Sequence, residues 1–192
     1  MRRIAGLGLI FAVGFWALGT FGPSSAAGAE QATEFRFDSP ELAPNTTVAG
    51  RFVYQGYGCR GLNLSPALNW SNPPEGTRSF VVTLFDPDAK GGAGWWHWVV
   101  YNLPATTRGL PEGAGSQPAN LLPAGAREGR TDFGESAYGG PCPPAGDPPH
   151  HYVFTIYALA SDHIELSGTG FRPDQGVLAR SSFTVRYGRG AQ

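Results

Sequence analysis

The sequence has little net charge. Its 14 basic and 15 acidic residues leave a formal charge of −1 over 192 residues, so there is no broad electrostatic basis for binding nucleic acid or an anionic membrane surface. It also lacks blocks of like charge and internal repeats. With 41% hydrophobic residues, the chain has the composition of one ordinary globular domain. Recognition of an anion must therefore be local.

Cysteine is scarce, since the chain has only two, Cys59 and Cys142. Both lie in the part that we expect to be exported, and an oxidising compartment favours a disulfide between them. Closing a loop of that length would stabilise the folded chain by about 4 to 5 kcal/mol, because the unfolded chain loses entropy. Two free thiols are the alternative.

The first thirty residues differ in composition from the rest. Two arginines precede an apolar segment, Ile4–Phe21, and Ala27-Gly28-Ala29 then supplies the small-x-small pattern of a cleavage site. This layout predicts a secretory signal peptide over residues 1–29 and one mature domain over residues 30–192, located in the periplasm or outside the cell. The apolar segment is just long enough to span a bilayer of about 30 Å, so an uncleaved anchor is the alternative. With the signal removed, no stable membrane span is expected.

Short runs of β-branched and aromatic residues recur, each bounded by Gly, Pro, Asn or Asp, and such runs are typical of strands. The predicted strands are Phe35–Phe37, Arg51–Gln55, Ser79–Phe85, Trp98–Asn102, Tyr152–Ala160 and Phe183–Tyr187. The run Ser79–Phe85 is almost continuously apolar, so we expect it to be central with both faces covered. One short helix is predicted around Gln175–Ser182. A mainly β fold follows.

Two carboxylates directly follow the Ser79–Phe85 run, in Asp86-Pro87-Asp88-Ala89. Residues two apart in an extended segment face the same way, so Asp86 and Asp88 can both point into one cleft at the end of a strand. Pro87 stiffens the turn between them. The alternative is that the carboxylates only cap a turn, as aspartate commonly does.

Aromatic residues are dense just after this turn, in Gly94-Trp95-Trp96-His97-Trp98. Tryptophan rings make good pocket walls because they offer large apolar faces with one donor each. His97 is therefore a candidate ligand-binding residue. The alternative is a histidine whose hydrogen bonds are satisfied within the core.

A loop rich in Gly and Pro runs from Tyr138 to Gly146 and is followed by His150-His151-Tyr152. Stacked Gly and Pro make a rigid loop that allows close approach, and its free backbone N–H groups can bind an anion. The alternative is a surface loop pinned by the disulfide, with both histidines solvated. The spacing of His and Asp fits no strong zinc pattern, so we expect neither a metal nor another cofactor.

In this order, the three elements resemble the signature regions of the phosphatidylethanolamine-binding family, in particular its bacterial Raf kinase inhibitor-like branch. The resemblance extends from about Phe35 to Tyr187. It also takes in further segments: Asn63-Leu64-Ser65-Pro66, Trp70, Asn102-Leu103-Pro104 and Arg130-Thr131-Asp132-Phe133-Gly134. Single pieces would be weak evidence, whereas their joint order and spacing are highly specific.

This resemblance implies two packed β-sheets with a few short helices. It also implies a small pocket for phosphate-type anions or phospholipid head groups, because family members bind such ligands. Carried over residue by residue, the pocket would use Asp86, Asp88, His97, Gly140, Pro143, His150 and Tyr152. Exported bacterial members pair a cysteine in a Gly-Cys-x-Gly turn with one before the Pro-Pro loop, which would join Cys59 to Cys142.

The chain departs from the family pattern after Ala89, where Lys90 replaces the usual proline. A cis peptide bond is strongly disfavoured there without proline, so the rim of the pocket is expected to differ. Lys90 also adds a cation beside the presumed anion site, where it either helps binding or points into solvent. The sequence after Ser161 matches the family only loosely.

The sequence thus predicts a secreted, non-catalytic binding protein. A protonated His97 or His150 and the loop amides would hold phosphate oxygens, while Asp86 or Asp88 would hold the ammonium of a zwitterion. Affinity for phosphate would then rise as the pH falls through about 6.5, the reference pKa of imidazole.

Two other classes of function stay open. Because eukaryotic relatives inhibit kinases or proteases, a protein partner is the first alternative. The second is a hydrolase that uses Asp and His for acid-base chemistry, although the chain has no Gly-x-Ser-x-Gly elbow.

Overall fold

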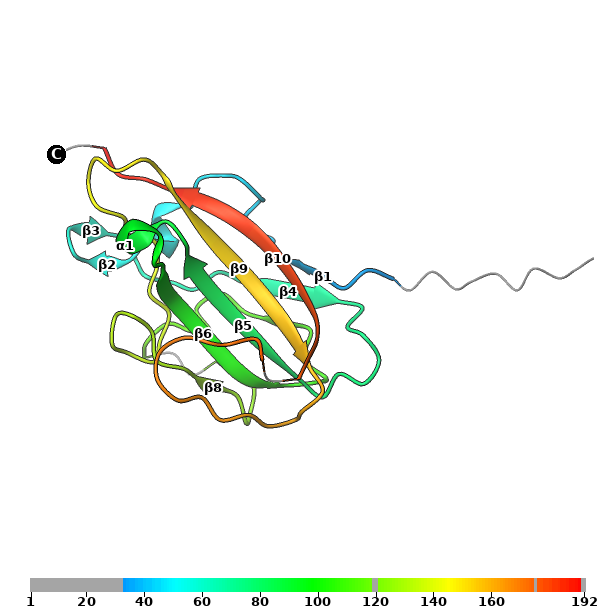
Figure 1. Cartoon of the computed structure of the whole chain (residues 1–192). Coiled ribbons are helices and arrows are strands. Elements are labelled where there is room, and N and C mark those ends of the chain that lie inside the picture. The colour runs from blue at the N-terminus through cyan, green and yellow to red at the C-terminus, as the bar shows by residue number, and fades with distance from the viewer. Residues whose placement is uncertain (1–32, 119–120, 175, 191–192) are drawn as a thin grey trace, which may run out of the picture. The chain divides into compact units, whose positions relative to one another are not determined.

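A five-stranded antiparallel sheet forms the centre of the structure (Figure 1). The computed structural model describes residues 33–118, 121–174 and 176–190. In sheet order the strands are β10 (Val177–Tyr187), β9 (His150–Leu159), β5 (Ser79–Asp86), β6 (Trp95–Pro104) and β8 (Arg127–Glu128). Strand β5 pairs with β9 on one side and with β6 on the other.

A smaller sheet packs against one face of this central sheet. It consists of β1 (Arg36–Asp38), β4 (Leu68–Ser71) and β7 (Gly109–Leu110), and a separate hairpin joins β2 (Gln55–Gly56) to β3 (Cys59–Arg60). Phe37 and Trp70 of the small sheet share one apolar core with Phe80 and Phe154 of the large sheet. The prediction of a mainly β structure with packed sheets is therefore confirmed.

Strand β5 has both of its faces covered, as its continuously apolar sequence predicts. Side chains alternate along a strand, and accordingly Val82 and Leu84 belong to the core beneath the small sheet. Val81 points to the other face, where a second apolar cluster includes Tyr157 and Phe171.

Helices contribute little to the described residues. They comprise the 3₁₀ turn η1 (Gly50–Phe52) and the short helix α1 (Ala89–Gly92). None of the described helices has the length and apolar character needed to cross a membrane. The predicted signal peptide, residues 1–29, lies outside the residues that the structure describes.

Two sequence predictions of local structure are wrong. The segment Gln175–Ser182 was expected to be helical, but Val177 to Ser182 form the first half of β10, because their backbone pairs with β9. The hydrogen-bonded ladder outweighs a weak local helix preference. The strand predicted over Arg51–Gln55 is present only at Gln55, the first residue of β2, whereas Arg51 and Phe52 belong to η1. The turn lets the consecutive residues Phe52 and Val53 both enter the core.

The strand order brings distant segments together at one edge of the central sheet, the edge formed by the end of β5 and the start of β9. Because β5 and β9 are antiparallel, the last residue of β5 and the first of β9 lie at the same edge. Helix α1 follows β5 directly, and it lies near the β2–β3 hairpin beyond this edge (Figure 1). Residues from four separate segments can therefore surround one space.

Candidate functional site

A cavity of about 600 Å³ opens at this edge of the sheet. Five of the seven predicted site residues line it: Asp86, Asp88, His97, Pro143 and His150. The other two, Gly140 and Tyr152, are not part of its wall. Trp95, from the tryptophan segment that was expected to supply pocket walls, also lines it. The remaining wall includes residues that the sequence did not point to: Tyr57, Phe133, Asp147 and Arg189.

Asp86 is the most fully bonded polar residue of the cavity. Its side chain is only 3% exposed, and its Oδ2 lies 2.7 Å from Nδ1 of His150. Its Oδ1 accepts hydrogen bonds from the backbone N–H groups of Asp88, at 2.9 Å, and Ala89, at 3.1 Å. Asp86 therefore caps the turn and also orients the imidazole of His150. The same carboxylate lines the cavity.

Asp88 lies at the exposed rim and pairs with His151. Its Oδ2 accepts a hydrogen bond from the backbone N–H of His151 at 2.7 Å and lies 2.8 Å from Nδ1 of that ring. The backbone hydrogen bond is the main reason why the pKa of Asp88 is lowered, and it outweighs the opposing effect of partial burial. Asp88 is therefore ionised at neutral pH.

His97 is buried behind the cavity, with 4% of its surface exposed. Its Nδ1 lies 2.7 Å from the carbonyl oxygen of Gly139, and because a carbonyl can only accept, Nδ1 carries the proton. Burial lowers the pKa of His97 to about 4. This shift favours the uncharged ring at neutral pH, so any protonation of His97 is expected only well below the reference value of 6.5.

Tyr152 lies beneath the cavity floor and is fully buried. Its ring packs edge-to-face on His97, with centroids 5.2 Å apart, and also contacts the ring of His150. Its hydroxyl has no hydrogen-bond partner among the described residues. Burial, followed by the charge of Asp86, raises the pKa of Tyr152. Tyr152 thus packs against both histidines, and it is not part of the cavity wall.

Gly140 lets its loop pack closely against a neighbouring backbone segment. Its N–H donates to Oδ1 of Asn63 at 2.8 Å, and a Cβ at this position would collide with the backbone of Phe52 and Tyr54. The absence of a side chain thus lets two chain segments come close.

Lys90 lies on the cavity wall, and its charge is balanced there. Its Nζ lies 3.4 Å from Oδ1 of Asp132 and 4.3 Å from the centre of the Trp95 ring. Its φ of 51° is one that proline, fixed near −65°, cannot adopt. Lys90 therefore adopts a backbone conformation that the family proline could not, and its side chain contacts the protein.

A stack of aromatic rings forms one side of the cavity. Phe133 stacks on Tyr54 with ring centroids 4.4 Å apart, and Tyr57 lies parallel to both. Tyr57, at 71% exposure, is the most exposed large apolar residue among those that the structure describes. Phe133 falls within the Arg130–Gly134 segment of the family resemblance, but no chemical signal in that segment marks it as a site residue.

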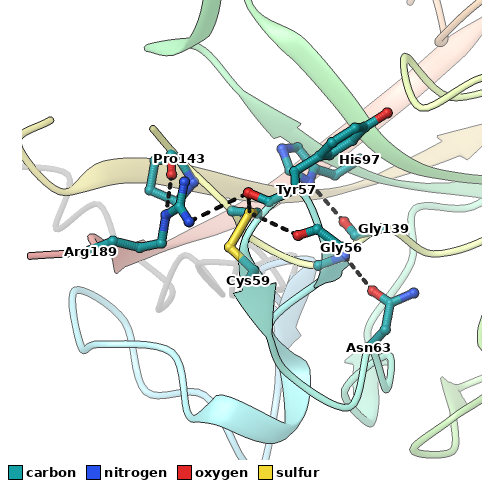
Figure 2. The surroundings of a disulfide bond; sticks show 10 residues. Gly56, Tyr57, Cys59, Asn63, His97, Gly139, Pro143 and Arg189 are labelled. Atoms are coloured by element: carbon teal, nitrogen blue, oxygen red, sulfur yellow. Dashed lines mark hydrogen bonds between the residues drawn. A yellow bond between two sulfur atoms is a disulfide. The ribbon is translucent and has the colours of Figure 1, made fainter. Parts of the chain in front are cut away.

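The predicted disulfide between Cys59 and Cys142 is present. It joins the β2–β3 hairpin, which carries Tyr57, to the loop that carries Pro143 (Figure 2). Cys142 itself lines the cavity. The crosslink therefore fixes two walls of the cavity relative to each other. In the part of the chain that the structure describes, no group of three His, Cys, Asp or Glu residues is arranged to hold a metal ion.

Known proteins are similar to this chain in sequence and in fold. The model of the family described as phosphatidylethanolamine-binding protein matches residues 38–187. YbcL of Escherichia coli is 50% identical over 163 residues, covering 82% of this chain and 89% of YbcL. YbhB of the same organism is 45% identical over 155 residues, covering 78% of this chain and 97% of YbhB. LppC of Mycobacterium tuberculosis, whose name proposes a lipoprotein, is 34% identical over 149 residues, covering 77% of this chain and 67% of LppC.

The structural comparison agrees with the sequence matches. The crystal structure of YbcL, described as a new member of the mammalian PEBP family, superimposes with a TM-score of 0.74 and 42% identity, covering 81% of this chain and 98% of that chain. The family resemblance seen in the sequence is thus confirmed. The chain belongs to the phosphatidylethanolamine-binding protein family.

Proposed function

We propose that this protein is an exported, non-catalytic binding protein whose cavity takes a phosphate-type anion or a zwitterionic phospholipid head group. The single observation that carries the proposal is the cavity of about 600 Å³ in which Asp86, Asp88 and His150 meet the Pro143 loop. Its volume suits a small ligand. The family description supports a ligand of the phosphoethanolamine type.

The carboxylates favour a ligand with a cationic group. Asp88 is exposed at the rim, and Asp147, also exposed, lies 3.6 Å from Nε2 of His150. An ammonium group placed between them would find acceptors that are solvated yet held in position. The negative charges of these carboxylates would repel a simple phosphate. Phosphoethanolamine, which carries both charges, is therefore the preferred probe.

Catalysis is the weaker interpretation because the described cavity wall offers no serine, threonine or free cysteine as a nucleophile. The described wall contains no Ser or Thr, and its one cysteine, Cys142, is in the disulfide. Asp86 and His150 form a pair of the kind used in acid-base catalysis. However, both oxygens of Asp86 are already bonded.

Export is supported by two observations. The disulfide is of the kind that persists in oxidising compartments, and the relative LppC carries a lipoprotein name. We therefore assign the protein to the periplasm or the extracellular space, with residues 1–29 as its signal peptide.

A second candidate function is binding to a protein partner, as an inhibitor would. Tyr57 and Leu62 flank strand β3 and are 71% and 66% exposed, and exposed apolar side chains are often found where partners bind. Such a partner would cover the hairpin at the mouth of the cavity. Capture of a stoichiometric protein by the wild type but not by Tyr57→Ala would favour this candidate.

Calorimetric titration of the oxidised, exported protein with phosphoethanolamine tests the proposed function. The Asp88→Asn variant should bind at least about tenfold more weakly, because one charge-assisted contact is worth about 1.5 to 3 kcal/mol. Asp162→Asn is the matched control, since Asp162 is an exposed aspartate that pairs with Arg78 and does not line the cavity. Absence of saturable binding to the wild type would refute the proposal.

A further inference from the structure

The cavity wall contains two basic side chains, Lys90 and Arg189. Lys90 is balanced by Asp132 at 3.4 Å. Arg189, by contrast, forms no ion pair with a carboxylate among the residues that the structure describes. Arg189 is partly exposed, so its guanidinium can receive an anionic partner from solution.

Two backbone carbonyls hold the Arg189 guanidinium in place. Its Nε donates to the carbonyl oxygen of Pro143 at 2.7 Å, and one terminal nitrogen donates to that of Tyr57 at 3.4 Å. Figure 2 shows the side chain lying between these two residues, next to the disulfide. A guanidinium has five N–H groups in a planar fork. The N–H groups that do not donate to these carbonyls remain available to two oxygens of a phosphate group.

Arg189 is also accessible from a second side. A groove of about 320 Å³ adjoins the cavity and shares two wall residues with it, Asp147 and Arg189. Its other walls come from Thr47, Pro149 and the end of β10. The Arg189 side chain therefore faces open space on two sides, so both a phosphate monoester and a phosphate diester are candidate ligands.

We propose that Arg189 is the residue that binds the phosphate group of the ligand, while the carboxylates of Asp88 and Asp147 bind its ammonium group. This inference rests on the proposed function and specifies how the two charges of the ligand are recognised. The uncharged state of His97 is consistent with it, since that ring contributes no positive charge to the site at neutral pH. Arg189 determines the selectivity for a phosphate ester over a simple amine.

The test uses dissociation constants from amide chemical shifts of the oxidised, exported protein. The ligands are phosphoethanolamine, glycerophosphoethanolamine and ethanolamine, and the variants are Arg189→Gln, Arg189→Lys and Arg186→Gln. Arg186 is the matched control, because it is an exposed arginine of the same strand end that lines neither the cavity nor the groove.

Arg189→Gln should weaken at least one of the two phosphate esters by about tenfold or more, with ethanolamine changed less than twofold. Arg189→Lys should retain part of the lost affinity, because it keeps the charge but not the fork. Arg186→Gln should match the wild type. The ester that is affected identifies a monoester or a diester as the ligand.

Three results would overturn the inference. Equal ester affinity in the wild type and Arg189→Gln would remove Arg189 from the site and leave the proposed function standing. An equal loss of affinity for all three ligands in both Arg189 variants, together with a lower melting temperature, would mean that Arg189 only stabilises the Pro143 and Tyr57 loops through its hydrogen bonds. Absence of ester binding to the wild type would refute the inference and the proposed function together.

Discussion

Nδ1 of His150 lies 2.7 Å from Oδ2 of Asp86, which joins the first residue of β9 to the last residue of β5. Both side chains are less than one tenth exposed. Because removing one partner leaves a buried group unsatisfied, this pair stabilises the strand ends as well as shaping the cavity floor.

Asp86→Asn should therefore lower the free energy of unfolding by about 1 to 3 kcal/mol. The amide can still accept the two turn hydrogen bonds, but its NH₂ group cannot accept the one from His150. Urea unfolding at pH 7 measures the change, with Asp162→Asn as an exposed control. Equal stability of the two variants would contradict the role assigned to the pair.

His97 should make the protein less stable in acid. Its pKa is about 4 in the folded protein against 6.5 for the model residue. The unfolded chain therefore binds more protons between these values, and stability falls as the pH is lowered from 6.5 to 4. The loss amounts to about 3 kcal/mol. Imidazole chemical shifts followed against pH should give a midpoint near 4, and a midpoint near 6.5 would show that the ring is not desolvated.

Glu128 should have the opposite effect on stability. Burial raises its pKa from 4.5 to about 7, although its carboxylate accepts a hydrogen bond from Nε1 of Trp98 at 2.9 Å. The folded protein then binds more protons, so the contribution of Glu128 is fully present below pH 4.5 and is lost as the pH rises through 7.

Glu128→Gln keeps an acceptor for Trp98 and removes the charge. We expect the variant to be more stable than the wild type at pH 8, by at most about 3 kcal/mol, and nearly equal to it at pH 4. Chemical unfolding at both pH values checks the difference. A variant that is destabilised equally at both would show that packing, and not the charge, dominates at this position.

Removal of the disulfide should affect both stability and binding. The two cysteines are 83 residues apart in the sequence, and a loop of that size corresponds to about 4 to 5 kcal/mol on the chain-entropy model. Replacing both cysteines by alanine should cost roughly that amount and weaken phosphoethanolamine binding, because the Tyr57 and Pro143 walls are then no longer joined. Unchanged affinity in the folded variant would show that other contacts keep the two walls in position.

Much of the cavity can be predicted from the sequence because its residues lie at the ends of strongly apolar strands. Asp86 follows the most continuously apolar run of the predicted mature domain, and His150 precedes the next long one. Antiparallel pairing of those two strands brings the residues together. The local sequence pattern is enough to predict the two strands, and their pairing places Asp86 and His150 at one cavity.

Other site residues could not be found in this way. Arg189 follows the last strand in a segment without a chemical motif, and its position depends on carbonyl oxygens of residues 46 and 132 positions away. Tyr152 was expected to bind ligand because the family resemblance implies it, and the structure shows that its side chain is fully buried and not part of the cavity wall. The region around Gln175–Ser182 was misassigned because its pairing partner, β9, decides its structure.

The most direct test of the central claim is a crystal structure of the oxidised protein with phosphoethanolamine at pH 7. The account predicts the ligand in the cavity between Asp88 and Pro143, with its ammonium toward the carboxylates and its phosphate toward Arg189. A ligand bound elsewhere, or an empty cavity in crystals grown at saturating ligand, would contradict the account.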